Sequence, residues 1–418
     1  MKALFRGAFV YENGKISKRD MLFDGVSLSA FSGDVSSVAP SSVFDNIVVF
    51  PGLCDVHVHL REPGFSYKET IESGTLASAR GGYTAVCSMP NLNPAPDSME
   101  NLEKQLEIIR RDAKIPVFPY GTITKGQAGE ELSDMEAMAD SVIAFSDDGR
   151  GVQNEDMMIS AMKKAKSIGK MIIAHCEDNS LMRGGYIHDG EYAAAHGHRG
   201  ICSESEWGQI ARDLKLVEQI GCAYHVCHIS TKESVEVIRE AKARGVDVTC
   251  ETGPHYILLD DSCLEEDGRF KMNPPLRSPE DREAILAGVL DGTIDMIATD
   301  HAPHSAEEKS KGLEKSAMGV VGIETAFPLL YTNLVKNGLI SLEGLIKLMC
   351  DNPRARFKIK RDPGFTVFKV DEKYKIDPDE FLSMGKATPF EGAEVYGKCL
   401  MTVCEGKVVY NAFPTGWE

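Results

Sequence analysis

Short apolar segments alternate with longer amphipathic segments along the middle of the chain. The apolar segments have the length of buried strands, and several of them end in a polar residue. They are residues 47–59, 83–90, 115–122, 141–146, 171–175, 223–228, 246–251 and 294–299. The amphipathic segments have the spacing of helices and are residues 68–80, 98–111, 154–168, 203–220, 231–244 and 278–290. Eight strands that alternate with helices predict an α/β fold, the (β/α)8 or TIM barrel.

Two of the predicted helices begin with a capping signal. Ser203 is followed three residues later by Glu206, and Ser278 by Asp281. At this spacing a hydroxyl and an acid can satisfy backbone N–H groups at the start of a helix. A doubly wound open sheet is the alternative fold. It is disfavoured because no GxGxxG follows the first strand, and because polar candidate ligands end many of the strands.

The two ends of the chain have a different pattern. Residues 1–46 contain short strand-like pieces broken by Gly and Asn, and period-two alternation returns after residue 358. We therefore predict that residues 1–46 and 358–418 together form a small β-sandwich domain. Residues 47–357 form the barrel in this interpretation.

Composition narrows the class of protein. The chain has 418 residues, 43% of them hydrophobic and 26% charged, as in a globular protein. It lacks an apolar run long enough to span a bilayer and a signal-peptide pattern, so we expect a cytoplasmic protein without membrane contact. The net charge of −17, without a basic patch, disfavours nucleic acid as a partner. An anionic substrate would need local cations, such as an arginine or a metal.

The cysteines indicate buried thiols. There are eleven, an odd number without CxxC spacing, which argues against a disulfide framework or a structural zinc site. Because neighbours in a strand point to opposite faces, Cys176 and Cys227 should point toward the helices if His175 and His228 point into the barrel.

Imidazoles and carboxylates gather at the predicted strand ends. Asp55, His57 and His59 share one face of the first strand, and two imidazoles at i and i+2 can bind one divalent cation. A single histidine is more often a hydrogen-bonded core residue, but four at strand ends indicate a metal site. The candidate ligands on the later strands are Asp148, His175, His228 and Asp300. They could hold one or two zinc-like ions, with Asp148 as a bridge and Asp300 as the proton carrier.

Four further residues could bind and orient a substrate. Arg61 follows the first pair of histidines, where its guanidinium could clamp a carboxylate through two hydrogen bonds. Asn91, Asn273 and His304 follow other strands. A surface salt bridge is the alternative for Arg61, and its position near a candidate ligand favours the functional role.

The remaining histidines are harder to assign. His188, His196 and His198 lie in the Gly-rich segment 184–200, where solvated surface positions are favoured over a mobile lid. His255 could support the site or belong to the core. Strand alternation would point His225 away from the face that carries His228.

Several of these motifs resemble those of dihydroorotases, a family of the amidohydrolase superfamily. The two most specific are Asp55-Val-His-Val-His-Leu-Arg-Glu-Pro-Gly64 and Ala298-Thr-Asp-His-Ala-Pro-His304, the second followed by Lys309. The resemblance covers essentially the whole predicted barrel, including Ala174-His-Cys-Glu, Val226-Cys-His-Ile-Ser-Thr and Met272-Asn-Pro-Pro-Leu-Arg277.

The resemblance implies a role for each matching residue. His57, His59 and Asp300 would bind one zinc ion, and His175 and His228 a second. Many relatives bridge the metals with a carboxylated lysine, where this chain has Phe-Ser-Asp147-Asp148-Gly. It resembles the bacterial type I branch in this, and the spacing to His175 favours Asp148 over Asp147. The substrate carboxylate would be held by Arg61, Asn91 and His304, with Asn273 near the dihydropyrimidine ring.

The implied reaction is the reversible zinc-dependent cyclisation of N-carbamoyl-L-aspartate to L-dihydroorotate, the third step of de novo pyrimidine biosynthesis. In the hydrolytic direction a metal-bound hydroxide attacks the ring carbonyl, and Asp300 is the general acid/base. We also expect a homodimer and consider aspartate transcarbamoylase as a partner. The alternatives are dihydropyrimidinase (hydantoinase), allantoinase and a non-catalytic subunit of a carbamoyltransferase complex.

Overall fold

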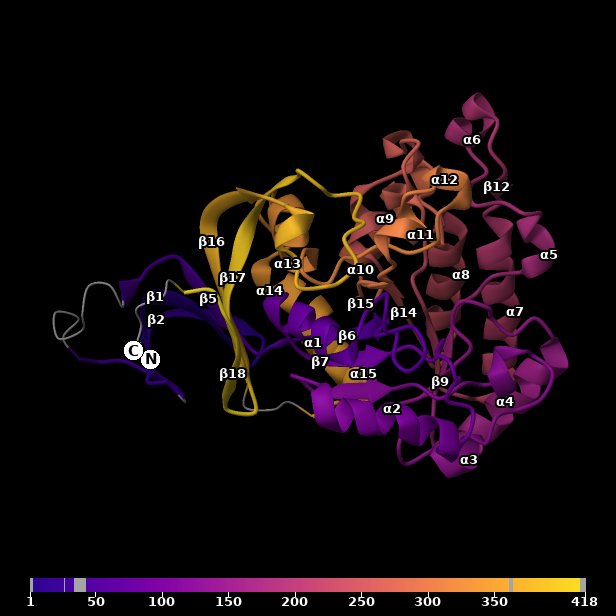
Figure 1. The fold of residues 1–418 in the computed structure, drawn as a ribbon, viewed down its shortest axis with the longest axis horizontal. Helices are drawn as coiled ribbons and strands as arrows, with labels where there is room; N and C mark the ends of the chain where they lie inside the picture. Colours follow the sequence, from indigo (N-terminus) through magenta and orange to yellow (C-terminus); the bar gives the residue numbers. More distant parts are fainter. Residues whose placement is uncertain (1–2, 26, 34–42, 361–363, 414–418) are drawn as a thin grey trace.

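The computed structural model describes residues 3–25, 27–33, 43–360 and 364–413. Figure 1 shows two parts, a sheet built from the two ends of the chain and a larger barrel surrounded by helices. Among the described residues, none of the helices combines the length and the apolar character needed to cross a bilayer.

The barrel consists of eight parallel strands in the described part of the chain. They are β6 (Leu53–Val58), β7 (Tyr83–Ser88), β8 (Val117–Pro119), β9 (Phe145–Ser146), β10 (Ile172–Ala174), β13 (Tyr224–Val226), β14 (Val248–Thr252) and β15 (Met296–Ile297). Regular pairing joins β6–β7–β8 and β9–β10–β13–β14–β15. Two parallel bridges, Gly121 with Phe145 and Val58 with His301, join these two groups into a closed ring. The predicted barrel is confirmed, with shorter strands than expected.

The six predicted helices are present. They are α1 (Ile71–Arg80), α2 (Met99–Asp112), α4 (Glu155–Ser167), α7 (Glu204–Ile220), α8 (Lys232–Ala243) and α10 (Pro279–Asp291). Shorter elements decorate the loops: α3 (Met135–Met138), α5 (Asn179–Met182), β11 (Ile187–His188), α6 (Glu191–His196), β12 (Gly200–Ile201), α9 (Pro254–Leu258), α11 (Ala306–Lys309), α12 (Gly312–Lys315), α13 (Ala326–Leu330), α14 (Leu342–Ile346) and α15 (Asn352–Phe357).

One of the two predicted helix caps is correct. Ser278 and Asp281 form a complete capping box at the start of α10. Ser203 precedes α7 but its hydroxyl makes no cap bond. Ser203 has helical backbone angles, φ −65° and ψ −30°, instead of the extended conformation of a capping residue. Glu206 turns inward, where Oε1 accepts hydrogen bonds from the backbone N–H groups of Ser230, at 2.9 Å, and Thr231, at 3.1 Å.

The terminal strands form one hydrogen-bonded sheet in the described residues. Its order is β18–β17–β16–β5–β1–β2–β3, with β4 also on β1. The strands are β1 (Ala3–Glu12), β2 (Lys15–Phe23), β3 (Leu28–Ala30), β4 (Val43–Phe44), β5 (Ile47–Phe50), β16 (Phe365–Lys375), β17 (Glu394–Cys404) and β18 (Lys407–Asn411). The rings of Phe23 and Phe365 lie 5.9 Å apart although β1 and β5 separate their strands. The sheet therefore curls around its own core, and the expected sandwich is one continuous sheet.

The expected boundary between residues 46 and 47 lies too early. β5 pairs with β1 and β16, so Ile47–Phe50 belongs to the terminal sheet. The chain turns at Pro51–Gly52 before β6 begins. A side chain at Gly52 would come within 2.1 Å of Thr84, which shows how closely the backbone passes the next barrel strand. The apolar run 47–59 thus contains two strands of different sheets.

The inside of the barrel is packed with side chains. Cys54, Val56, Cys87 and Tyr120 belong to a buried cluster that also includes Phe357, the last residue of α15. This packing leaves the carboxyl ends of the strands as the place for a binding site.

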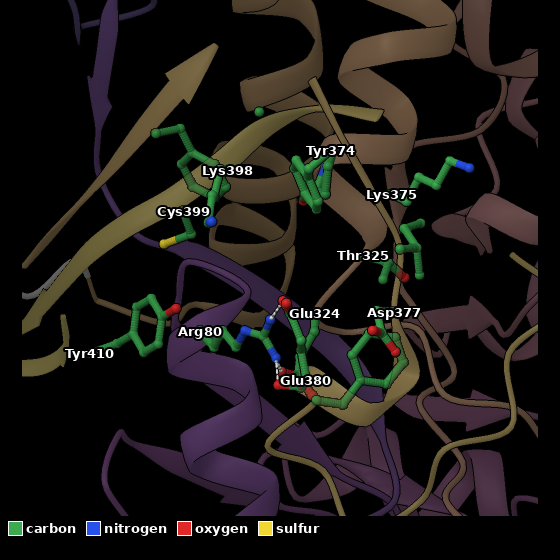
Figure 2. Close-up of a pocket in the computed structure, with 15 residues that line it drawn as sticks. Arg80, Glu324, Thr325, Tyr374, Lys375, Asp377, Glu380, Lys398, Cys399 and Tyr410 are labelled. Carbon is green, nitrogen blue, oxygen red and sulfur yellow. Dashed lines mark hydrogen bonds and ion pairs between the residues drawn. The ribbon is translucent and has the colours of Figure 1, made fainter. Parts of the chain in front are cut away.

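A polar contact ties the C-terminal segment to the barrel. Arg80 of α1 forms ion pairs with Glu324, at 2.9 Å, and Glu380, at 3.4 Å (Figure 2). The small cavity beside it, about 40 Å³, has room for little more than water. Glu324 also accepts hydrogen bonds from the backbone of Leu382 and Ser383, both at 3.0 Å. This contact holds the C-terminal segment at residues 380–383 against the barrel.

Candidate metal centre and active site

The predicted metal ligands converge at the carboxyl ends of five barrel strands. His57 and His59 come from the end of β6, and one further ligand follows each of β9, β10, β13 and β15. These four are Asp148, His175, His228 and Asp300. All six side chains are buried.

One group of ligands lies between the first and last strands. His57 Nε2 is 3.5 Å from Asp300 Oδ1, and His59 Nε2 is 3.1 Å from the same oxygen. Asp148 lies beside them, with Oδ1 at 3.5 Å from His57 Nε2 and Oδ2 at 3.6 Å from His59 Nε2. These imidazoles and carboxylates therefore face a common point.

The other two histidines lie on the far side of Asp148. His175 Nδ1 and His228 Nε2 are 2.9 Å apart, and they lie 3.7 Å and 3.6 Å from Asp148 Oδ1. Burial by itself raises the pKa of Asp148, but the imidazoles of His57, His228 and His59 hold it well below its usual range. The carboxylate of Asp148 thus lies between the two pairs of histidines.

The backbone at the strand ends is strained into the left-handed region. Arg61, His228 and Asp300 have φ values of 59°, 31° and 45°. Such conformations cost free energy for residues with a side chain and persist where the surroundings hold them. At these three residues the backbone conformation directs the side chain away from the face that strand alternation would give it. Asp55 holds the turn at β6, since its Oδ1 accepts a hydrogen bond from His57 N at 3.0 Å.

Two of the histidines are oriented by neighbouring acceptors. His57 Nδ1 donates to Glu251 Oε1 at 2.7 Å, and His59 Nδ1 contacts Asn91 Oδ1 at 2.8 Å. Both contacts direct Nε2 toward the common point, as supporting residues commonly do for metal-binding histidines. Burial by itself raises the pKa of Glu251, but the imidazoles of His57 and His225 outweigh it and lower the pKa to about 2. His225 reaches the other oxygen of Glu251 at 3.1 Å.

The residues at this point fit a divalent cation. His57 Nε2, His175 Nε2 and Asp148 Oδ1 are buried polar atoms without a hydrogen-bond partner among the described residues. Imidazole nitrogens and carboxylate oxygens are ligands that zinc and similar ions accept. A bound cation would satisfy His57 Nε2 and Asp148 Oδ1, which face the common point. His175 presents its other nitrogen, Nδ1, to Asp148, while its Nε2 faces Glu177.

A cavity of about 190 Å³ opens above the ligands. All four predicted substrate-binding residues line it, together with five of the six predicted metal ligands. The four are Arg61, Asn91, Asn273 and His304. The structure therefore brings the two predicted groups of residues into one pocket.

Arg61 and His304 form one wall of the cavity. Arg61 Nε donates to the carbonyl of Pro303 at 3.1 Å, and Nη2 lies 3.4 Å from His304 Nε2. His304 Nε2 donates to the carbonyl of Met318 at 2.8 Å. Burial, Arg61 and Lys68 lower the pKa of His304 to about 3, so its imidazole is neutral at neutral pH. Burial lowers the pKa of Arg61 to about 10, which leaves the guanidinium charged.

The two asparagines contact residues of the metal centre as well as the cavity. Asn91 Nδ2 donates to Asp148 Oδ2 at 3.4 Å. Asn273 Nδ2 donates to Glu177 Oε1 at 2.8 Å, and Glu177 Oε2 lies 3.6 Å from His175 Nε2. Asn273 Oδ1 is buried without a partner in the described structure. This oxygen is thus an acceptor that a ligand N–H group could satisfy.

Asp147 lies away from the histidines. Its Oδ1 accepts hydrogen bonds from Ile123 N at 2.8 Å and Thr124 N at 3.1 Å, and these bonds fix the loop after β8. Asp148, the next residue, is the carboxylate among the imidazoles.

The predicted directions of Cys227 and His225 were wrong. Cys227 belongs to the packed interior of the barrel, and His225 contacts Glu251 there. The alternation argument failed because β13 ends at Val226 and His228 then adopts its left-handed conformation.

The remaining histidines lie outside the cavity lining. His196 is exposed and His198 pairs with Glu266 at 2.7 Å, but His188 is buried, so the expectation of a solvated position was wrong for it. His255 is buried against Tyr256. Burial lowers the pKa of His255 to about 4.

Sequence reasoning missed Glu251 and Glu177. Glu251 follows the same signal as the histidines, a polar residue at the end of an apolar strand, in Cys250-Glu-Thr252. Glu177 follows His175 by two residues. The signal was present, but glutamates are common on surfaces and carry less weight than histidines.

A closed ring of parallel strands, with imidazoles and carboxylates at the carboxyl ends around a site for a divalent cation, defines a metal-dependent hydrolase barrel of the amidohydrolase type. Its residues 46–234 match a family described as dihydro-orotase-like. With 49% identity to a dihydroorotase of Fusobacterium nucleatum, over 97% of this chain and 98% of the relative, the chain belongs to the dihydroorotase family. It is also 47% identical to a dihydroorotase of Bacillus cereus, over 98% of this chain and 99% of that relative.

Solved structures give the same fold. An L-hydantoinase (dihydropyrimidinase) of Arthrobacter aurescens is similar with a TM-score of 0.83 and 26% identity, over 98% of this chain and 96% of the other. A D-hydantoinase of a Thermus species has a TM-score of 0.80 at 22% identity, over 99% and 97% of the two chains. The second similarity bears on the fold alone.

The network around Glu251 generates a prediction about stability. Glu251→Ala should lower the free energy of unfolding by about 1–3 kcal/mol for each ring nitrogen that loses its partner, because both lie in the barrel interior. Glu251→Gln, which keeps one acceptor oxygen, should lose less. Urea denaturation followed by circular dichroism measures both changes. Equal stability of Glu251→Ala and the unchanged protein would contradict this account.

Proposed function

We propose that the protein is a zinc-dependent dihydroorotase that interconverts N-carbamoyl-L-aspartate and L-dihydroorotate. One observation carries the proposal. A single cavity of about 190 Å³ holds both a charged guanidinium, Arg61, and the carboxylates and imidazoles suited to a metal, including Asp300. Dihydroorotate likewise has a carboxylate on the ring whose amide is hydrolysed. Membership of the dihydroorotase family supports the same reaction.

The metal ligands divide into two sets around one carboxylate. His57, His59 and Asp300 would hold one cation, and His175 and His228 a second. Asp148 would bridge them, which its position between the two pairs of histidines supports. When bound, the cations would polarise the reacting carbonyl and lower the pKa of a water molecule.

The wall beside Arg61 would hold the substrate carboxylate. The guanidinium has donors left for two parallel hydrogen bonds. Its Nε donates to Pro303, and the His304 nitrogen nearest to Nη2 itself donates to Met318 and does not accept from Arg61. Asn91 and His304 line the same cavity, and the free Oδ1 of Asn273 would accept from a ring N–H group. These contacts would orient the ring carbonyl toward Asp300.

Asp300 would carry the proton. In the synthetic direction its carboxylate takes a proton from the carbamoyl nitrogen, which attacks the side-chain carboxyl carbon to form the new C–N bond. Asp300 returns this proton to a carboxyl oxygen, which leaves as water after taking a second proton from solvent. In the hydrolytic direction Asp300 takes a proton from water and gives it to the departing ring nitrogen. A carboxylate suits this role because it lies at the cavity and is ionised at neutral pH.

Hydantoinase activity is the nearest alternative, because the barrel is similar to an L-hydantoinase. The presence of Arg61, Asn91 and His304 in the cavity lining favours a substrate with a ring carboxylate, which hydantoin does not have. The cytoplasmic location, the homodimer and the aspartate transcarbamoylase partner stay predictions.

The proposal is tested by assaying the purified protein with dihydroorotate, hydantoin and allantoin, alongside elemental analysis. We expect turnover of dihydroorotate at least about 100-fold faster than of the other two, with one or two zinc ions per chain. A preference for hydantoin would favour the alternative. A protein without zinc and without turnover would be a structural subunit.

Arg61→Ala should raise KM for dihydroorotate by about 10- to 100-fold, the effect of losing one or two hydrogen bonds to a charged group. Arg61→Lys keeps the positive charge but cannot form a bidentate pair with a carboxylate, and it should raise KM less than Arg61→Ala does. Steady-state kinetics in the hydrolytic direction measures both. An unchanged KM in Arg61→Ala would remove Arg61 from the binding site.

Asp300→Ala should lower kcat by about 1,000-fold or more while the fold is retained, because the variant lacks both a ligand and the proton carrier. Circular dichroism and turnover of dihydroorotate measure the two properties. Asp291→Ala, at the exposed end of α10, is the matched control and should keep full activity. Retained activity in Asp300→Ala would overturn the mechanism.

A further inference from the structure

We propose that Lys309 is a positioning residue that holds together the wall of the substrate-carboxylate pocket. The inference rests on the proposed function, since it assigns a role in binding dihydroorotate. Lys309 is the last residue of the short helix α11, five residues after His304, and the proposed reaction does not use it.

The ammonium group of Lys309 is enclosed by backbone carbonyls. The residue is only 7% exposed. Its Nζ donates to the carbonyl oxygens of Lys271 at 2.9 Å, Ala317 at 2.8 Å and Gly319 at 2.7 Å. A lysine has three N–H donors, and these three acceptors use all of them. The group is therefore saturated and has no donor left for a substrate.

The three carbonyls belong to the segments that form the pocket wall. Lys271 precedes Asn273 by two residues. Ala317 and Gly319 flank Met318, whose own carbonyl accepts the hydrogen bond from His304 Nε2 at 2.8 Å. One ammonium group thus joins the segment that carries Asn273 to the segment that orients His304.

The fit around Gly319 leaves little room for movement. A Cβ atom at this position would lie 2.8 Å from Ala302 and 3.1 Å from His304 Nε2. The backbone of residue 319 therefore passes directly against the imidazole. A shift of this segment by a few tenths of an ångström would change how His304 and Arg61 meet a carboxylate.

Burial accounts for the strength of the contact. Burial lowers the pKa of Lys309 to about 7, because an ammonium group in a protein interior is costly unless it is hydrogen-bonded. The ammonium form supplies all three donors, and bonds from a charged donor are stronger than neutral ones. Removing the charge would leave three buried carbonyls without this partner. The segments around residues 271 and 317–319 would then separate, while the metal ligands keep their own contacts.

Lys309→Met, which has a similar shape without the charge, tests the inference. We expect KM for dihydroorotate to rise at least about tenfold, while kcat stays within about threefold and the zinc content is unchanged. Lys309→Gln keeps two N–H donors and should give an intermediate KM. Lys311→Met is the matched control, because Lys311 lies on the surface and pairs with Glu307 at 3.6 Å. It should behave as the unchanged protein.

Two further measurements separate positioning from a general structural role. In a His304→Ala background, adding Lys309→Met should raise KM by less than about threefold, because both changes act on the same contact. Amide hydrogen exchange of residues 316–320 should be faster in Lys309→Met than in the control. This exchange measurement does not depend on catalysis. Failure of the unchanged protein to turn over dihydroorotate would overturn the proposed function and leave the exchange test valid.

An unchanged KM together with unchanged exchange in Lys309→Met would overturn the inference. A loss of zinc, or a fall in kcat without a change in KM, would also overturn it, because either result would place the effect of Lys309 at the metal centre.

Discussion

The carboxylate of Asp148 lies in a buried place with four imidazoles around it, at 3.5–3.7 Å. Two of them come from the first strand of the barrel and two from strands on the other side of the carboxylate. A charge in such a place is stable only if opposite charge or a cation compensates it. The arrangement therefore couples distant strands of the barrel through one group. The rest of the active site is built around this requirement.

The surrounding structure keeps these groups in their orientations. Glu251 and Asn91 fix two of the rings through Nδ1, and the packed barrel interior blocks the space beneath them. His228 and Asp300 keep strained backbone conformations at the strand ends. The free energy that this strain costs is offset by the packing and hydrogen bonds of the whole barrel. A geometry of this kind suits a site that must be formed before the substrate arrives.

The sequence predicted the barrel and the convergence of the candidate ligands because both depend on a simple periodicity. Parallel strands end at the same side of a barrel, so His57, His175 and His228 could be expected to meet although more than 50 residues separate each from the next. The break at Pro51–Gly52 was missed because apolar residues continue on both sides of it.

Directions of single side chains were less predictable. His225 and Cys227 were misplaced because alternation holds only while the backbone stays extended, and that extension ends before His228. Asp148 could be preferred to Asp147 only weakly from spacing, since the choice depends on which carboxylate the loop after β8 captures. The role of Lys309 could not be read from its neighbours in sequence, because its partners are backbone carbonyls of two other segments.

The C-terminal segment reaches from the terminal sheet to the mouth of the barrel. The hydroxyl of Ser383 donates to Glu69, and Gly385 packs against Pro303, the residue whose carbonyl holds Arg61. The wall of the pocket is therefore supported from behind by residues that follow Asp300 by more than eighty positions. A site formed at the ends of barrel strands thus also depends on a contact made outside the barrel.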